Sequence, residues 1–143
     1  MEIKIICHSN DEYEQMINLR VTQLLLPIGV PASYIQKENE KHDILIGAFE
    51  NNETIGCCVL TPRENGVIQL RQMTVREDYR GKKIGAAIVQ FAEKVARENN
   101  FSILMMHARD PVIDFYKKSG YLIAGEQFFE VGMGHHKMQK QLS

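Results

Sequence analysis

The sequence lacks both a large excess of charge of one sign and any long hydrophobic run. Its 17 Lys and Arg residues nearly balance 18 Asp and Glu residues, which gives a formal net charge of −1 at pH 7. This balance argues against a strongly basic nucleic-acid binder. No apolar run approaches the ~20 residues that span a bilayer, so no membrane insertion is expected. Residues 1–4 alternate charge and apolarity like a strand and unlike a secretory signal, so cytoplasm is the expected compartment.

Cysteine is also scarce, with only Cys7, Cys57 and Cys58 in the chain. Neighbouring residues of a strand point to opposite faces, so Cys57 and Cys58 are not expected to bridge each other or to share a metal ion. We expect all three thiols to be reduced and to act as small core or surface residues. A cysteine nucleophile is the less favoured alternative.

The 143 residues are expected to form one domain, 1–143, without repeats or linkers. Hydrophobic alternation predicts strands over residues 1–8, 43–50, 54–60, 67–75, 101–108, 121–124 and 136–141. Helical spacing and helix-end residues predict a helix that begins with a Ser9–Glu12 capping box and stops at Pro27, a possible short helix at 33–39, a long helix from Ile84 to Asn99-Asn100, and a short helix from Asp110-Pro111 to Ser119-Gly120.

These elements follow the order β-α-(α)-β-β-β-α-β-α-β-β. Asn65-Gly66 favours a type I′ hairpin, because both residues tolerate positive φ, and it joins two strands of an antiparallel meander. The strand-helix-strand unit over 67–108 should form a right-handed parallel crossover. Together they predict an α/β fold with a mixed seven-stranded sheet and helices on both faces.

The segment Arg80–Ala86, which leads into the long helix, has the properties of an anion-binding turn. The first turn of a helix has free backbone N–H groups and a partial positive charge, and Gly81 lets the backbone approach an anion closely. Arg80, Lys82 and Lys83 add full charges that oppose the helix dipole, so an anionic partner is indicated. The alternative is an ordinary helix start with solvated basic residues. The spacing matches neither a Walker A loop nor a dinucleotide-binding fingerprint.

The run Val75-(x)3-Tyr79-Arg80-Gly81-Lys82-Lys83-Ile84-Gly85-(x)2-Ile88 resembles motif A, [QR]-x-x-G-x-[GA], of the GNAT acyltransferases, with Lys83 in place of the middle glycine. The run Asp114-Phe115-Tyr116-Lys117-Lys118-Ser119-Gly120-Tyr121 resembles their motif B, F-Y-x-x-x-G-[FY]. The order of elements is also similar to the GNAT order over nearly the whole chain. The stretch Gly125–Met138 and Leu19-Arg20 resemble small bacterial ElaA-like members of that family.

The resemblance implies an N-acetyltransferase that moves an acetyl group from acetyl-CoA to a primary amine of a small molecule or protein, by direct attack in a ternary complex. It implies that a bulge of the fourth strand offers amides to the thioester and splays this strand from the next. Tyr116 matches the family's general acid, which protonates the leaving thiolate. The residues implied in coenzyme binding are Met73, Thr74, Val75, Arg80, Gly81, Lys82, Lys83, Ile84, Gly85, Ala86, Arg109 and Phe115, with Arg109 where many members carry Asn.

Several alternatives stay open. The general base could be Glu130, His135 or His107, or water could take the proton. His135-His136 has no third ligand at a telling distance, so no metal is expected. Glu38, Glu40 and Glu130 could favour a cationic amine, but solvated surface acids are the simpler interpretation. The chain could instead be a non-catalytic acyl-CoA-binding sensor, and ATP binding is disfavoured because Mg²⁺ ligands are missing. Edge strands would permit a homodimer.

Overall fold

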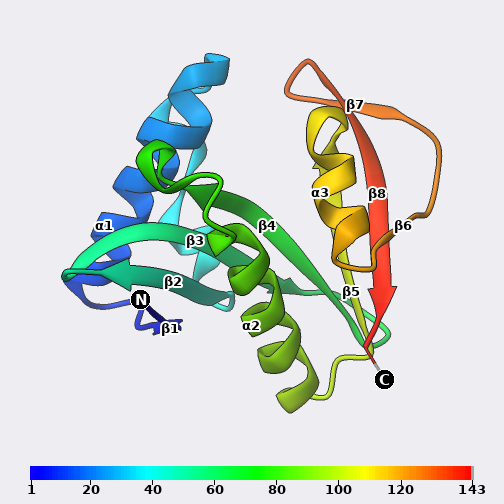
Figure 1. The fold of residues 1–143 in the computed structure, drawn as a ribbon, viewed down its shortest axis with the longest axis horizontal. Helices are drawn as coiled ribbons and strands as arrows, with labels where there is room; N and C mark the ends of the chain where they lie inside the picture. The colour runs from blue at the N-terminus through cyan, green and yellow to red at the C-terminus, as the bar shows by residue number, and fades with distance from the viewer. Residues whose placement is uncertain (143) are drawn as a thin grey trace.

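The chain folds around one mixed sheet of eight strands in the computed structural model, which describes residues 1–142 (Figure 1). The strand order is β1-β2-β3-β4-β5-β8-β6, and β7 pairs with β8 off this path. Of these pairs, β4–β5 is parallel and the others are antiparallel. The strands are β1 Glu2–Ile6, β2 Ile44–Glu50, β3 Glu53–Pro62, β4 Val67–Val75, β5 Ile103–Arg109, β6 Leu122–Ile123, β7 Phe128–Glu130 and β8 Met133–Gln141. The predicted α/β fold with a mixed sheet is confirmed.

The sequence predicts seven strands, and the additional strand is β7. It spans only three residues and turns back into β8 through Val131-Gly132, both of which have positive φ (46° and 75°). A β-branched residue rarely adopts positive φ, so this turn gives little local signal. The hairpin at Asn65-Gly66 does have positive φ at both residues, as predicted.

Three α-helices cover the sheet: α1 Asp11–Arg20, α2 Ile84–Glu98 and α3 Ile113–Lys118. The predicted Ser9 cap of α1 is wrong by one residue, because Asn10 is the N-cap and its side chain accepts a hydrogen bond from the Glu12 amide. Asp110 also fails to cap a helix. Its carboxylate accepts hydrogen bonds from His136 and Gln127 instead, and a 3₁₀ turn precedes α3.

The helices lie on both faces of the sheet, as predicted. Side chains of α2 and α3 pack with one buried cluster, and those of α1 pack with a second cluster on the opposite face. Cys57 belongs to the α1 cluster and Cys58 to the α2 cluster, so the two thiols do point to opposite faces. All three cysteines are free, and burial raises the pKa of the Cys57 thiol to about 12.

Between α1 and β2 the chain runs through short irregular turns in place of the possible helix at 33–39. They are a π turn and three 3₁₀ turns: η1 Val21–Leu25, η2 Leu26–Ile28, η3 Ala32–Tyr34 and η4 Lys37–Glu40. The helical run therefore ends around Pro27, as the sequence indicates, but α1 itself already ends at Arg20. In Figure 1 the first of these turns stack above α1 at one end of the molecule. None of the helices in the described part of the chain is long and apolar enough to cross a membrane.

The crossover β4-α2-β5 opens the sheet. The two parallel strands pair only where Val67–Gln69 lies beside Ile103–Met105, and beyond these residues they separate (Figure 1). The long helix α2 begins near the upper end of β4 and packs Ile88, Ala92 and Val95 into the core. The opening between β4 and β5 is therefore built into the fold and lies next to the N-terminus of α2.

Candidate active site

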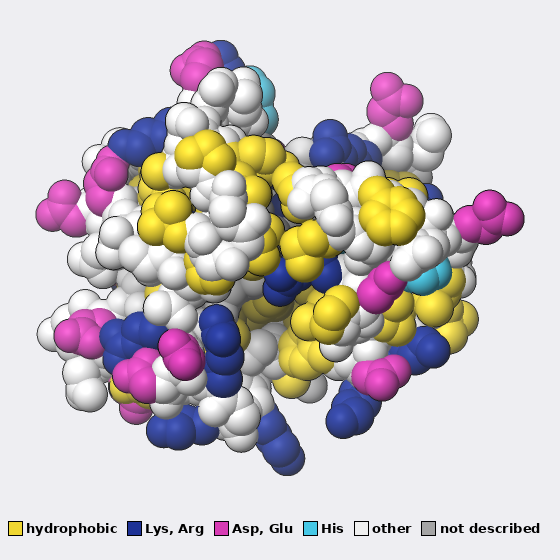
Figure 2. Space-filling model, turned by 90° about the horizontal axis from the view of Figure 1, so that it is seen from above, with side chains coloured by type: hydrophobic (Ala, Val, Ile, Leu, Met, Phe, Trp, Pro, Cys, Tyr) yellow, Lys and Arg dark blue, Asp and Glu magenta, His cyan; other side chains and the backbone are white. Residues whose placement is uncertain are grey.

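A cleft of about 1160 Å³ lies at the opening between β4 and β5. Its walls come from η1 to η3, β4, the start of α2, β5, α3 and the β7–β8 turn. Figure 2 looks onto this end of the molecule. Lys or Arg side chains lie in a hollow between two groups of hydrophobic side chains. A cleft that combines apolar walls with a few converging polar groups is the usual form of a small-molecule site.

The predicted anion-binding turn forms one end of the cleft. Its lining residues are Arg80, Gly81, Lys83, Ile84, Gly85 and Ala86. The first backbone hydrogen bond of α2 runs from the Ala87 amide to the Lys83 carbonyl, so the preceding amides have no partner within the helix. The first turn of α2 has neither a capping side chain nor an acidic residue. A 15-residue helix thus presents an uncompensated N-terminus to the cleft, which favours a bound anion.

Lys83 occupies a backbone conformation that normally favours glycine. Its φ is +63°, and it follows Gly81 with φ +80°. The turn therefore has a glycine-like, left-handed backbone at Lys83, at the cost of some strain. Arg80 is exposed and donates from Nε to the Val75 carbonyl at 3.0 Å. Lys82 does not line the cleft, because its Nζ lies over the Tyr79 ring, 5.0 Å from the centroid.

The β4 bulge lies at the middle of the cleft. Cys57 pairs with Thr74 but Val59 pairs with Arg71, so β4 has one extra residue between these pairs. Gln72 takes a positive φ of 53° there. A bulge bends the strand and frees a ladder amide, which is what the fourth strand is expected to offer. Of the three residues assigned to this bulge, Met73 and Val75 line the cleft, whereas Thr74 is buried and does not.

Tyr116 and Phe115 bring α3 to the same cleft, and Arg109 lines it from the end of β5. Tyr116 is 5% exposed, and burial raises the pKa of its phenol above the ordinary value, so the group is protonated at neutral pH. The rings of Phe115 and Tyr116 meet edge to face at 5.0 Å. A Cβ on Gly85 would come within 3.0 Å of the Phe115 ring, so α2 and α3 touch where the two motifs meet.

Known proteins are similar to this chain in sequence and in architecture. The family model described as "Acetyltransferase (GNAT) family" matches residues 13–121. The chain is 24% identical over 139 residues to the uncharacterized N-acetyltransferase YjcF of Bacillus subtilis, covering 95% of this chain and 97% of that protein. Escherichia coli ElaA superposes with a TM-score of 0.85 at 17% identity, covering 97% and 98% of the two chains. An aminoglycoside 6′-N-acetyltransferase solved with coenzyme A has a TM-score of 0.84 at 18% identity, covering 100% and 98%.

The chain belongs to the acetyltransferase (GNAT) family. The matched region includes both motifs and the whole of β4, α2, β5 and α3, so the match covers the elements of the cleft other than β7 and β8. The chain is therefore an acyltransferase. The predicted resemblance to the ElaA-like branch agrees with the similarity in fold to ElaA.

The three candidates for a general base of this GNAT chain meet on one wall of the cleft. Nδ1 of His107 lies 2.9 Å from Oε2 of Glu130. Nε2 of His135 lies 4.0 Å from Oε1 of the same carboxylate, and its Nδ1 donates to the Met133 carbonyl at 2.8 Å. The Phe128 ring packs between them, stacked on His135 and edge-on to His107. The sequence places these groups in different segments, and the pairing of β5 and β7 with β8 brings them together. Among residues 1–142 no three His, Cys, Asp or Glu residues form a metal-binding group.

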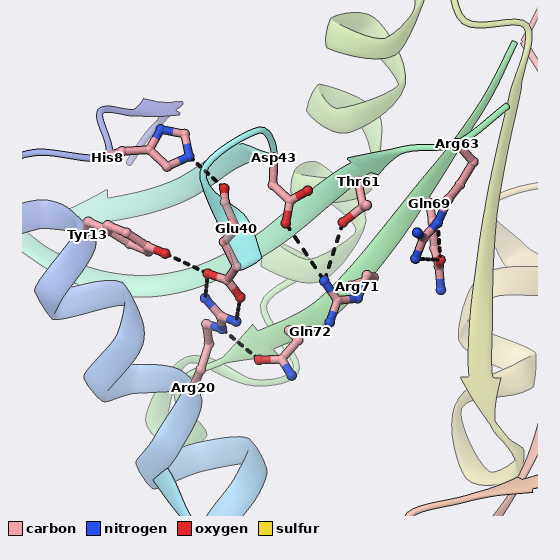
Figure 3. A network of polar contacts seen from close by, with 10 residues as sticks. All are labelled: His8, Tyr13, Arg20, Glu40, Asp43, Thr61, Arg63, Gln69, Arg71 and Gln72. Atoms are coloured by element: carbon pink, nitrogen blue, oxygen red, sulfur yellow. Dashed lines mark hydrogen bonds and ion pairs between the residues drawn. The ribbon is translucent and has the colours of Figure 1, made fainter. Parts of the chain in front are cut away.

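A buried polar network beside the cleft escapes the sequence analysis (Figure 3). Arg20 of α1 has no exposed surface and forms a two-pronged ion pair with Glu40, which is also buried. Glu40 accepts a further hydrogen bond from the Tyr13 hydroxyl at 2.7 Å, and Arg20 Nε donates to the Gln72 side chain at 2.7 Å. The interpretation of Glu40 as a solvated acid is therefore wrong. Glu38 is exposed and pairs with Lys41, as a surface acid should.

A second group that sequence reasoning missed lies on the β3–β4 side of the cleft. Arg63, Gln69 and Arg71 all line it. Isolated arginines near a hairpin give no functional signal on their own, because such residues are usually solvated surface groups. Only the register of β4 shows that Gln69 and Arg71 share one face, and Arg63 reaches Gln69 from the hairpin beyond β3.

Proposed function

We propose that this acyltransferase moves an acetyl group from acetyl-CoA to a primary amine within a ternary complex. The proposal is supported most by one arrangement: the bare N-terminus of α2, the β4 bulge and Tyr116 all line a single cleft. The related aminoglycoside acetyltransferase was solved with coenzyme A, which supports a CoA-type acyl donor here. The donor's thioester supplies an activated acetyl carbon and a thiolate leaving group.

The turn before α2 fits a diphosphate. A Cβ built on Gly81 would meet nothing within 4 Å, so the space over this turn is open. The free amides of Gly85 and Ala86 and the side chains of Arg80 and Lys83 are available to phosphate oxygens. The opening between β4 and β5 then accommodates the extended arm, and the amide freed by the bulge at Gln72 and Met73 polarises the carbonyl.

The chain's side chains provide the proton transfers. The amine gives up one proton, its lone pair attacks the acetyl carbon, and a C–N bond forms while the C–S bond breaks. Tyr116 donates its proton to the sulfur and regains one from the product nitrogen. One proton thus ends on sulfur and one is released. The raised pKa of Tyr116 ensures that the proton is present at neutral pH.

Binding is tested first. Isothermal titration calorimetry with CoA and acetyl-CoA should show binding at micromolar concentrations. Thiol release from acetyl-CoA in the presence of an amine panel then separates an enzyme from a non-catalytic sensor, which would bind without turnover. Failure of both ligands to bind would refute the proposal.

The role of Tyr116 is tested by Tyr116→Phe, which removes the proton and keeps the ring. Turnover should fall by about tenfold or more, within the range of general acid catalysis, while CoA affinity stays nearly unchanged. Tyr121→Phe is the matched control, since its ring lies 6.0 Å from that of Tyr116, Tyr121 itself does not line the cleft, and its hydroxyl donates to Glu93. The control should alter stability and leave turnover intact. Full activity of Tyr116→Phe would remove the assigned role.

A further inference from the structure

One end of the cleft lies on the face of the sheet opposite to α2, and we call it the acceptor end. Leu70 of β4 and Met106 of β5 are buried in the cluster that packs against α2. Since strand residues alternate between faces, Arg71 and His107 point to the other face. On that face α1 packs mainly against β3, and the polar residues of β5 remain beside the open cleft. An amine that enters from this face would meet the bulge across the opening between β4 and β5.

One side of the acceptor end carries arginines with guanidinium N–H groups that are not fully used in hydrogen bonds. Arg63 uses Nε and Nη2 on the Gln69 side-chain oxygen, at 2.9 and 2.7 Å. Arg71 uses only Nη1 within residues 1–142, in a 3.4 Å contact with the Thr61 hydroxyl. The Asp43 carboxylate lies 3.8 Å from this Nη1, which is too long for a hydrogen bond, so the pair leaves the donors of Arg71 largely unused. Two guanidinium groups with spare donors are suited to a carboxylate or phosphate.

The other side offers a proton acceptor. An ionised Glu130 requires the proton of His107 to be on Nδ1, where the two groups are 2.9 Å apart. The neutral imidazole then has its lone pair on Nε2, and His107 lines the cleft. Glu130 thus holds His107 in the tautomer that can take a proton from an ammonium group. Phe128 packs edge-on to this imidazole and restricts its rotation.

The arginines and His107 lie on opposite sides of the point where β4 and β5 separate. Gln69 and Met105 are the last paired residues of these strands. Arg71 and His107 are the next residues on the same face, one on each side of the opening. Paired strands lie about 4.8 Å apart, and β4 and β5 diverge beyond their last pair, so the gap between Arg71 and His107 is wider than one strand spacing. A single small acceptor can therefore contact both groups at once.

We propose that the acceptor is a small primary amine that also carries an anionic group. Arg63 and Arg71 hold the anion, and the amine lies at Nε2 of His107, which takes its proton before attack on the acetyl carbon. Apolar side chains of η1 to η3, among them Leu24 and Ile28, cover the remainder of the acceptor. This inference rests on the proposed acetyl transfer and narrows its acceptor to amines of this class.

The test measures kcat/KM for pairs of amines that differ in one anionic group: lysine and cadaverine, phenylalanine and phenethylamine, phosphoethanolamine and ethanolamine. The anionic member of at least one pair should be preferred by about tenfold or more, the range of a charge-assisted hydrogen bond. The first two pairs report a carboxylate and the third a phosphate. Arg71→Gln should reduce this preference by a similar factor, and Arg71→Lys should retain part of it. Arg97→Gln, a substitution outside the cleft, should leave the preference unchanged.

Each outcome decides the inference. Preference for the member without the anionic group in every pair overturns it, as does an unchanged preference in a folded Arg71→Gln variant, with folding checked by its thermal transition. If amines without an anionic group are acetylated and amines with one are not, the proposed function stands and this inference fails. If acetyl-CoA does not bind and no amine of either kind reacts, both fail. For the amine end, His107→Gln should remove the acidic limb of the pH profile of kcat/KM, and retention of that limb would exclude this role.

Discussion

Replacing Arg20 by methionine should strongly destabilise the fold. The guanidinium has no exposed surface, and the carboxylate of Glu40 is 5% exposed. Arg20→Met therefore leaves a buried carboxylate whose only remaining side-chain partner in the described chain is the Tyr13 hydroxyl. Breaking a buried ion pair on one side costs about 3–5 kcal/mol. For a chain of this size that corresponds to a fall in melting temperature of roughly 10–15 °C.

Urea unfolding followed by far-UV circular dichroism measures the free energy of unfolding, which suits a chain without tryptophan. Lys37→Met is the matched control, because Lys37 pairs with Glu14 at the surface and both side chains are more than half exposed. It should cost less than about 1 kcal/mol. The double variant Arg20→Met/Glu40→Leu should recover most of the loss, since it leaves no unpaired charge. A small loss in Arg20→Met, or strictly additive losses in the double variant, would refute the reasoning.

The pH dependence gives a second check on the same pair. Burial alone would raise the pKa of Glu40, but the hydrogen bonds and charge of Arg20 outweigh burial and leave this pKa below its ordinary value. A lowered folded pKa contributes stability above the unfolded pKa of about 4.3, and this contribution disappears as the pH falls through the folded value. The difference in unfolding free energy between the wild type and Glu40→Gln should therefore be largest near neutral pH and narrow below about pH 4.

Two further substitutions are expected to raise stability. Burial raises the pKa of Asp43, so its ionised form lowers the stability of the fold above the unfolded pKa. Asp43→Asn should therefore increase the free energy of urea unfolding at pH 7. This gain should disappear at acidic pH, where Asp43 is protonated. Lys83→Gly should relieve the left-handed backbone and stabilise the fold by up to about 1 kcal/mol. It should also weaken CoA binding by up to about fivefold in low salt, measured by calorimetry, because one cation is lost. A less stable Lys83→Gly variant would contradict the strain at this position.

The parts of the fold that the sequence predicts are those specified by local patterns. The 3.6-residue spacing of α2 and the positive φ of Asn65-Gly66 depend on neighbouring residues alone, and both predictions are confirmed. The failures involve distant partners. Asp110 is a good N-cap by composition, yet it bonds His136, which is 26 residues away. Strand β7 exists because β8 pairs with it, and its three residues carry no pattern of their own.

The candidate site also has a part specified by a local pattern and a part that depends on distant partners. The predicted anion-binding turn is a local motif, so the segment Arg80–Ala86 could be singled out from the sequence. Six of its seven residues line the cleft, all except Lys82. The residues proposed to contact the acceptor have no such motif. His107 and Glu130 come from β5 and β7, and they meet only because both strands pair with β8.

This division has a physical reason. Every acyl-CoA enzyme of this fold must bind the same diphosphate, and a helix N-terminus with a glycine turn is a local solution to that need. An acceptor is recognised by charges placed around its own outline, and several strands must supply them. Arg71 enters the cleft through the register of β4 with β3, and His107 through the register of β5 with β8. A one-residue slip in either register would move its side chain to the α2 face. The proposed acceptor site is therefore specified by strand pairing, whereas the proposed diphosphate site is specified by the local turn before α2.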